Sequence, residues 1–80
     1  MEVLDLTGMV CPMPVLRTKR ALGRLAPGEE LVVRTDDPHA VEDLAVFAKQ
    51  SGHALISQQP DDEKPGSVLH TLRVRGEKAV

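Results

Sequence analysis

The one cysteine of this 80-residue chain, Cys11, stands in the segment Cys11-Pro12-Met13-Pro14. The stretch that follows, up to Leu25, is rich in Leu, Arg, Lys and Ala, which predicts a helix that begins at Cys11 or Pro12. Two early prolines suit such a start, because first-turn amides have no intrahelical partner to lose. The helix dipole and nearby cations would lower the pKa of a cysteine there below about 8.5, and they would also stabilise a persulfide anion. The sequence therefore predicts a nucleophilic thiolate at Cys11.

Core filling is the alternative role for Cys11, since free cysteine is among the most buried residue types. Its place at a chain junction beside a basic helix favours the reactive role. Pro12, Met13 and Pro14 are expected to frame the thiol, with the prolines fixing the backbone and Met13 offering an apolar contact surface. A single cysteine excludes an internal disulfide, and without a Cys-x-x-Cys or Cys/His pair no metal site is recognisable. No cofactor is expected.

Basic side chains follow Cys11 along the predicted helix. At about 100° per residue, Arg17, Arg20 and Arg24 share one side, which we call the arginine stripe, and Lys19 lies at the border of the apolar side. Such a row is usually a solvated face, but its expected position next to Cys11 favours the docking of an acidic partner or an RNA backbone.

The elements that must position Cys11 are predicted from periodicity and turn residues. Strands are expected at 2–6, 31–35, 53–59 and 68–75, and a second helix is expected to be capped by Asp37, to start at Pro38 and to end near Ser51. The order βαβαββ favours an α+β fold, a two-layer α/β sandwich in which a four-stranded mixed sheet carries both helices on one face. Val46 falls outside the apolar arc of the second helix, without an evident reason.

The histidines are expected to be non-catalytic. His39 would lie in the first turn of the second helix and His53 at a strand start, while His70 would be a half-buried, hydrogen-bonded imidazole on the alternating face of the last strand.

Length and composition limit the classes of protein. Eighty residues predict a single domain spanning 1–80, and 41% hydrophobic with 28% charged residues are typical of a folded chain. A net charge of −2 argues against direct nucleic-acid binding. The acidic N-terminal segment is unlike a signal peptide, and no apolar run approaches the roughly 18 residues of a membrane span. Together with the absence of disulfides, this predicts a cytoplasmic protein without a membrane partner.

Several of these motifs occur together in one known family. Leu6-x-Gly8-x-x-Cys11-Pro12-x-Pro14, followed by Lys19, Asp36-Asp37-Pro38 and Gly52-His53, resembles the TusA (SirA-like, YhhP-like) sulfur-carrier family over nearly the whole chain. The resemblance implies a fold like the C-terminal domain of translation initiation factor three. It also implies that a cysteine desulfurase or rhodanese gives sulfane sulfur to the cysteine, and that the persulfide passes to a downstream acceptor protein.

In this family the sulfur feeds thiolation of the wobble uridine of tRNA, molybdenum cofactor synthesis or the oxidation of reduced sulfur compounds. Carried over, Cys11 is the persulfide site, Lys19 matches a basic position for partner contacts, and Asp37 matches the acid near the second helix, where a plain helix cap is the simpler role. The thiouridine branch often has Glu between the two prolines, whereas Met13 suits a different partner. Two other classes stay open, a small RNA-binding domain and a thiol redox regulator, although the latter usually has a second cysteine.

Overall fold

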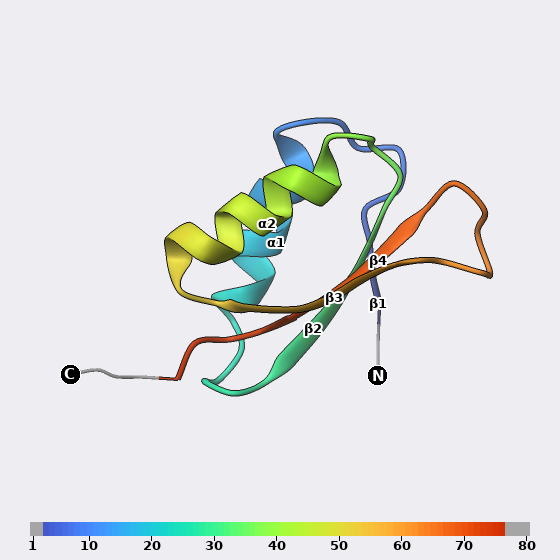
Figure 1. Ribbon diagram of the computed structural model, residues 1–80. Coiled ribbons are helices and arrows are strands. Elements are labelled where there is room, and N and C mark those ends of the chain that lie inside the picture. Colours follow the sequence, from blue (N-terminus) through green and yellow to red (C-terminus); the bar gives the residue numbers. More distant parts are fainter. Residues whose placement is uncertain (1–2, 77–80) are drawn as a thin grey trace.

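The computed structural model describes residues 3–76, which form two helices packed on one face of a four-stranded sheet (Figure 1). Along the chain the elements are β1 (Val3–Asp5), α1 (Met13–Leu22), β2 (Glu30–Thr35), α2 (Ala40–Ser51), β3 (Ala54–Pro60) and β4 (Val68–Arg73). The predicted order, the mixed sheet and the placement of both helices are confirmed. Neither helix in this part of the chain has the length and apolar character needed to cross a membrane.

The sheet has the strand order β1-β2-β4-β3, with β1 parallel to β2 and both of the other pairs antiparallel. Helix α1 is the crossover from β1 to β2, and α2 is the crossover from β2 to β3, with β4 inserted between those two parallel strands. Right-handed crossovers in the same sense bring both helices to the same face of the sheet. Consequently the starts of α1 and α2 lie at the same end of the molecule (Figure 1).

An aliphatic core fills the space between the helices and the sheet. Leu22 of α1 and Ala48 of α2 belong to one buried cluster with Val33 and Leu72 of the sheet, and all four are at most 2% exposed. The alternation predicted for the last strand is confirmed at His70 and Leu72, which are buried. Burying each such leucine or valine is worth about 1.5–3 kcal/mol, so these side chains fix how the helices sit on the sheet.

The helix starts differ from the predicted ones. Helix α1 begins at Met13, so Cys11 precedes it by two residues instead of being its first residue. Helix α2 begins at Ala40, and Asp37 and Pro38 form the turn before it, so the predictions that Asp37 caps the helix and that Pro38 opens it are wrong. At the other end, α2 stops at Ser51 as predicted, and Gly52 is its left-handed C-cap, with φ of +85°.

A buried polar network joins β2, β3 and β4 to the start of α2. The Gln58 side-chain amide donates to the carbonyl oxygen of Val41 and to Nδ1 of His70 at 2.8 and 3.0 Å. With Nδ1 accepting, Nε2 carries the imidazole hydrogen and donates it to Oγ1 of Thr35 at 2.7 Å. His70 is therefore hydrogen-bonded as predicted, although it is fully buried and not half-buried.

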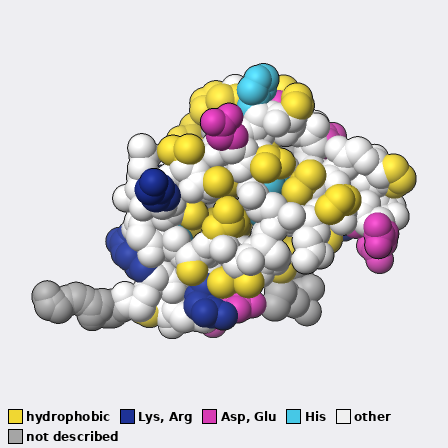
Figure 2. Space-filling model, viewed as in Figure 1, with side chains coloured by type: hydrophobic (Ala, Val, Ile, Leu, Met, Phe, Trp, Pro, Cys, Tyr) yellow, Lys and Arg dark blue, Asp and Glu magenta, His cyan; other side chains and the backbone are white. Residues whose placement is uncertain are grey.

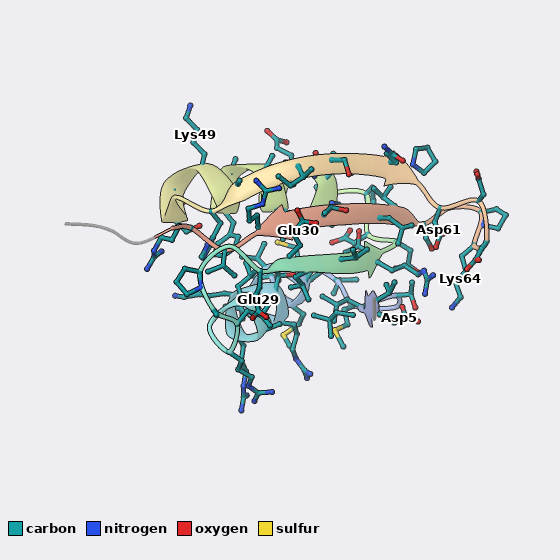
Figure 3. All side chains as sticks on the ribbon, turned by 90° about the horizontal axis from the view of Figure 1, so that it is seen from below. Asp5, Glu29, Glu30, Lys49, Asp61 and Lys64 are labelled. Carbon is teal, nitrogen blue, oxygen red and sulfur yellow. The ribbon has the colours of Figure 1, made fainter. Side chains whose placement is uncertain are left out.

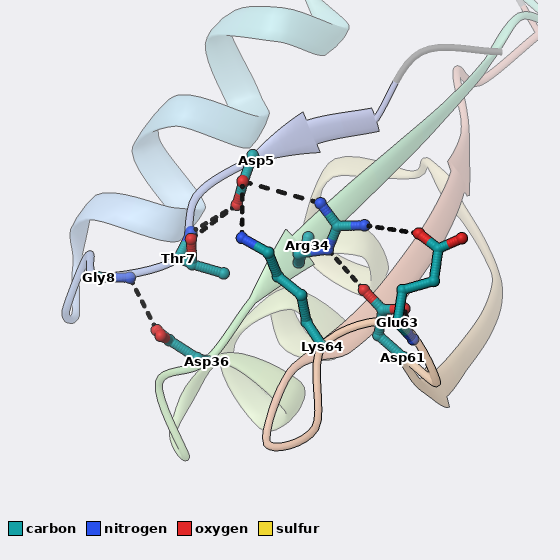
Figure 4. Close-up of polar contacts among 8 residues, drawn as sticks. All are labelled: Asp5, Thr7, Gly8, Arg34, Asp36, Asp61, Glu63 and Lys64. Carbon is teal, nitrogen blue, oxygen red and sulfur yellow. Dashed lines mark hydrogen bonds and ion pairs between the residues drawn. The ribbon is translucent and has the colours of Figure 1, made fainter.

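A charged network fastens the β3–β4 loop to the sheet beside the chain that leads to Cys11. Arg34 of β2 binds the buried Asp61 of that loop and also lies 3.7 Å from Asp5 of β1 (Figure 4). Asp5 additionally accepts from the amide and hydroxyl of Thr7. Figure 3 shows Asp5, Asp61 and Lys64 toward the same end of the sheet. This network fixes where β1 ends and the Cys11 loop begins.

Candidate functional site

Cys11 lies in the loop between β1 and α1, and its side chain is exposed and free. The loop turns at Gly8, whose φ of +83° is a backbone conformation that glycine adopts without strain. The Cys11–Pro12 peptide bond is cis, and the amide of Met13 donates to the carbonyl oxygen of Val10 across the cysteine at 2.9 Å. Because its side chain is exposed, Cys11 is not core filler.

Two consecutive aspartates after β2 hold the Cys11 loop. Asp36 accepts the amide hydrogen of Gly8, and Oδ2 of Asp37 accepts that of Cys11 itself, both at 2.9 Å. The other oxygen of Asp37, Oδ1, accepts from the amide of His39 at 3.3 Å. Burial alone would raise the pKa of Asp37, but the amides of His39 and Cys11, with the His39 imidazole, hold that pKa below its usual value. Asp37 therefore joins the reactive loop to the turn before α2.

A groove of about 500 Å³ between α1 and α2 opens beside the thiol. The groove is defined by its lining residues, Cys11, Pro12, Val15, Glu42, Asp43, Val46, Phe47 and Gln50. Figure 2 shows hydrophobic side chains over much of the face that carries the helices, with Lys and Arg toward its left and lower edges. Val46, the residue outside the apolar arc of α2, is 46% exposed and lines this groove, which accounts for its position.

The charges nearest to Cys11 are negative. The carboxylate of Asp43 is placed to accept the thiol hydrogen, and this contact, partial burial and the charges of Asp43 and Asp37 raise the pKa of Cys11 above its usual value. The predicted lowering of that pKa is therefore wrong. The prediction rested on the first helix and its cations, whereas the acids come from α2 and from the turn before it, far away in the sequence.

An exposed apolar rim, Val10, Met13 and Leu16, adjoins Cys11 in the chain. Val10 is 67% and Leu16 is 52% exposed, while Met13 is half-buried. Of the framing prolines, Pro12 is exposed beside the thiol and Pro14 is buried under the first turn of α1. Sequence reasoning singled out Met13 but neither Val10 of the loop nor Leu16 of α1.

The arginine stripe is exposed as predicted, but it does not line the Cys11 groove. Arg17, Arg20 and Arg24 surround a separate hollow together with Leu4 and Leu6 on the β1 side of α1.

Lys19 lies on the opposite flank of α1 from that hollow. It lines a second hollow between α1 and α2, which shares Phe47 with the Cys11 groove and also contains His53 and Arg75. The structure thus brings Cys11, Pro12 and Asp37 together and places Lys19 in the neighbouring hollow between the two helices. The three arginines lie apart from both hollows.

Sequence reasoning did not single out Glu42 and Asp43, which lie in the first turn of α2. An acid in the first turn of a helix is common, because it complements the helix dipole, so neither residue stood out. Among residues 3–76, no group of three or more His, Cys, Asp or Glu side chains is arranged to hold a metal ion.

Comparisons with known proteins identify one family. The family model described as sulfurtransferase TusA matches residues 2–74. A Neisseria meningitidis relative is 41% identical over 61 residues, covering 76% of this chain and 82% of its own. The sulfur carrier protein TusA of Allochromatium vinosum is 39% identical over 63 residues, 79% of this chain and 83% of its own.

A further relative and a solved structure match almost the full length. The sulfur carrier protein TusA of Pseudomonas paraeruginosa is 36% identical over 75 residues, 94% of this chain and 91% of its own. The crystal structure of a SirA-like protein from Desulfitobacterium hafniense superposes with a TM-score of 0.79 at 28% identity, covering 95% of this chain and all of that one. The chain therefore belongs to the TusA family and is, like these relatives, a sulfur carrier protein.

Proposed function

We propose that Cys11 accepts a sulfane sulfur atom from a donor protein, holds it as a persulfide and passes it to an acceptor protein. A sulfur carrier exchanges sulfur with a donor and an acceptor, and Cys11 is the only thiol of this chain. The observation that carries the proposal is the position of this thiol, exposed on a loop whose backbone is pinned by Asp36 and Asp37. A persulfide there extends outward into the reaction centres of two other proteins, and the exchange involves no cofactor.

The donor in this proposal is a cysteine desulfurase or a rhodanese, and the setting is the reducing cytoplasm, which keeps a lone thiol free. The acceptor belongs to tRNA thiolation, molybdenum cofactor synthesis or sulfur-compound metabolism. The apolar rim formed by Val10, Met13 and Leu16 supports a protein surface as the immediate acceptor, since exposed apolar side chains close in the sequence to a reactive group favour protein contacts.

Sulfur loading is the direct test. After incubation with a cysteine desulfurase and L-cysteine, intact mass spectrometry is expected to find one added sulfur atom on the wild-type protein and none on Cys11→Ser. Cysteine-to-serine exchange removes the nucleophile at an exposed position, so the variant keeps its fold. If rhodanese with thiosulfate also fails to load the wild-type protein, or if the serine variant gains sulfur equally, the proposal is wrong.

The arginine stripe is proposed to dock an acidic partner surface during this exchange. Reversing the charge at Arg20 and Arg24 together is expected to slow sulfur transfer about tenfold at low salt, and the difference should shrink as salt rises. Lys49→Glu, on an exposed side chain that projects outward from α2, is the matched charge reversal away from the stripe (Figure 3). Equal rates for the stripe variant and the Lys49 variant would contradict the docking role.

A further inference from the structure

The Cys11 groove combines an apolar floor with acidic side chains at the thiol. Pro12, Val15, Val46 and Phe47 form the apolar part, and Glu42 and Asp43 stand beside Cys11. None of the described residues that line this groove is a lysine, an arginine or a histidine. The groove therefore offers negative charge next to the sulfur without an internal counter-charge along its lining.

Nearby positive groups do not compensate this charge within the groove. His39 lies 3.5 Å from Asp37 in the turn before α2, and it is largely exposed. Lys19 lines the neighbouring hollow, beyond Phe47. A segment of another protein that enters the groove at Cys11 thus meets Glu42 and Asp43, and an anionic segment would be repelled there.

The exposed apolar surface sets the second requirement on an occupant. Val46 is 46% exposed, and Phe47 is only half-buried between the groove and the core. Covering such side chains is favourable at about 25 cal/mol per Å² of apolar area removed from water. An occupant that fits both features carries a cation near its reactive sulfur and an apolar side chain further along.

We propose that this groove receives a partner segment with a lysine or arginine beside its own reactive sulfur, and that this cation pairs with Asp43 and Glu42 and thereby frees the Cys11 thiolate. The inference rests on the proposed sulfur exchange at Cys11 and adds how that exchange is restricted to matching partners. In the free protein, Asp43 lines the groove together with Cys11, and its carboxylate opposes a second negative charge on the sulfur. Pairing of Asp43 with an incoming cation weakens this opposition at the moment of docking.

The exchange itself then balances. Sγ of Cys11 attacks the terminal sulfur of the partner's persulfide, so that a new S–S bond forms at Cys11 while the S–S bond in the partner breaks. The partner's cysteine leaves as a thiolate and takes up the proton that Cys11 released. One thiol and one persulfide thus become one persulfide and one thiol, without net oxidation and without a further reactant.

Charged peptides test the groove without a natural partner. The probes are two short peptides with one central cysteine, activated as a mixed disulfide with thionitrobenzoate, and flanked either by Lys and Leu or by Glu and Leu. Attack by Cys11 releases the coloured thiolate, which gives a second-order rate. At low ionic strength the Lys peptide is expected to react at least about tenfold faster than the Glu peptide, because opposite charge accelerates encounter by about 10-fold or more.

Neutralising the acids should remove that preference. In the double variant Glu42→Gln and Asp43→Asn the ratio of the two rates is expected to fall toward one, chiefly because the Glu peptide reacts faster. Asp62→Asn removes the same kind of charge from an exposed residue of the β3–β4 loop, outside the groove, and should keep the wild-type ratio. A wild-type ratio near one, or a ratio that survives in the double variant, overturns the inference.

The two proposals can fail separately. A charge preference that depends on Glu42 and Asp43, together with no sulfur loading by desulfurase or rhodanese, keeps the groove as a docking surface and rejects the persulfide role. Sulfur loading at Cys11 without any charge preference keeps the persulfide role and rejects the groove inference.

Discussion

Replacing Asp37 with alanine is expected to slow sulfur transfer to Cys11 by up to about 10²-fold, because misplacing a reacting atom by about 1 Å has an effect of that size. Asp37 is the only acceptor found for the Cys11 amide in the described part of the chain, and its second oxygen binds the amide of His39. Without the carboxylate, the loop loses its connection to the turn before α2. The measurement is the initial rate of persulfide formation from a desulfurase.

Two comparisons separate positioning from electrostatics. Asp37→Asn keeps an oxygen for the Cys11 amide and is expected to restore most of the transfer rate, whereas Asp36→Ala removes only the Gly8 contact and should have a smaller effect. Alkylation by iodoacetamide needs no protein docking. Since the charge of Asp37 helps to raise the pKa of Cys11, alkylation should become slightly faster in Asp37→Ala while sulfur transfer slows. Parallel loss of both rates would point to general damage to the loop instead.

Asp37 also illustrates what the sequence could and could not predict. Asp-Pro before a helical pattern predicted an acid near the start of α2, and such an acid is there, but its role depends on which chain segment lies opposite. The Cys11 loop is 26 residues away along the sequence and reaches Asp37 only because the parallel crossover brings the starts of both helices together. Local capping rules contain no information about that contact.

The prediction of a lowered pKa for Cys11 was wrong for the same reason. The prediction of a lowered pKa considered only the helix that follows the cysteine and the arginines on it. In the structure the arginines lie on the β1 side of α1, while Asp43 comes from the other helix. Val46 did not fit the apolar arc of α2, because a helical wheel divides residues only into buried and exposed ones. In the structure this side chain lines a groove. Periodicity predicted the helices, the strands and their layers. The charges and apolar side chains around Cys11 depend on how α1 packs against α2, which periodicity does not predict.

The buried imidazole of His70 makes the stability of the fold depend on pH. Burial lowers its pKa from the usual 6.5 to about 4. In the neutral ring, Nδ1 accepts from Gln58 and Nε2 donates to Thr35, so that both nitrogens are used. A second proton would set two hydrogen-bond donors against each other at Nδ1, and it would place a charge in the core.

Lowering the pH from 7 to 4 is therefore expected to reduce the free energy of unfolding by about 3 kcal/mol through His70 alone. Above pH 6.5 the imidazole is neutral in both the folded and the unfolded chain, and His70 makes its full contribution to the free energy of unfolding. Between 6.5 and about 4 the unfolded chain binds a proton that the folded protein does not, so stability falls across this window and the contribution is constant below it. Urea titrations at several pH values measure it.

The pH window separates the contribution of His70 from those of the carboxyl groups. Asp5, Asp37 and Asp61 have lowered pKa values, so their contributions are lost only as the pH falls below the usual carboxyl range. His53, whose pKa is also lowered by burial and by Arg75, adds to the same slope as His70. His70→Gln should flatten the slope between pH 6.5 and 4.5. Because the glutamine variant also loses core packing, NMR titration of the wild-type imidazole gives the direct measurement, and a His70 ring that titrates near pH 6.5 in the folded protein would contradict the account.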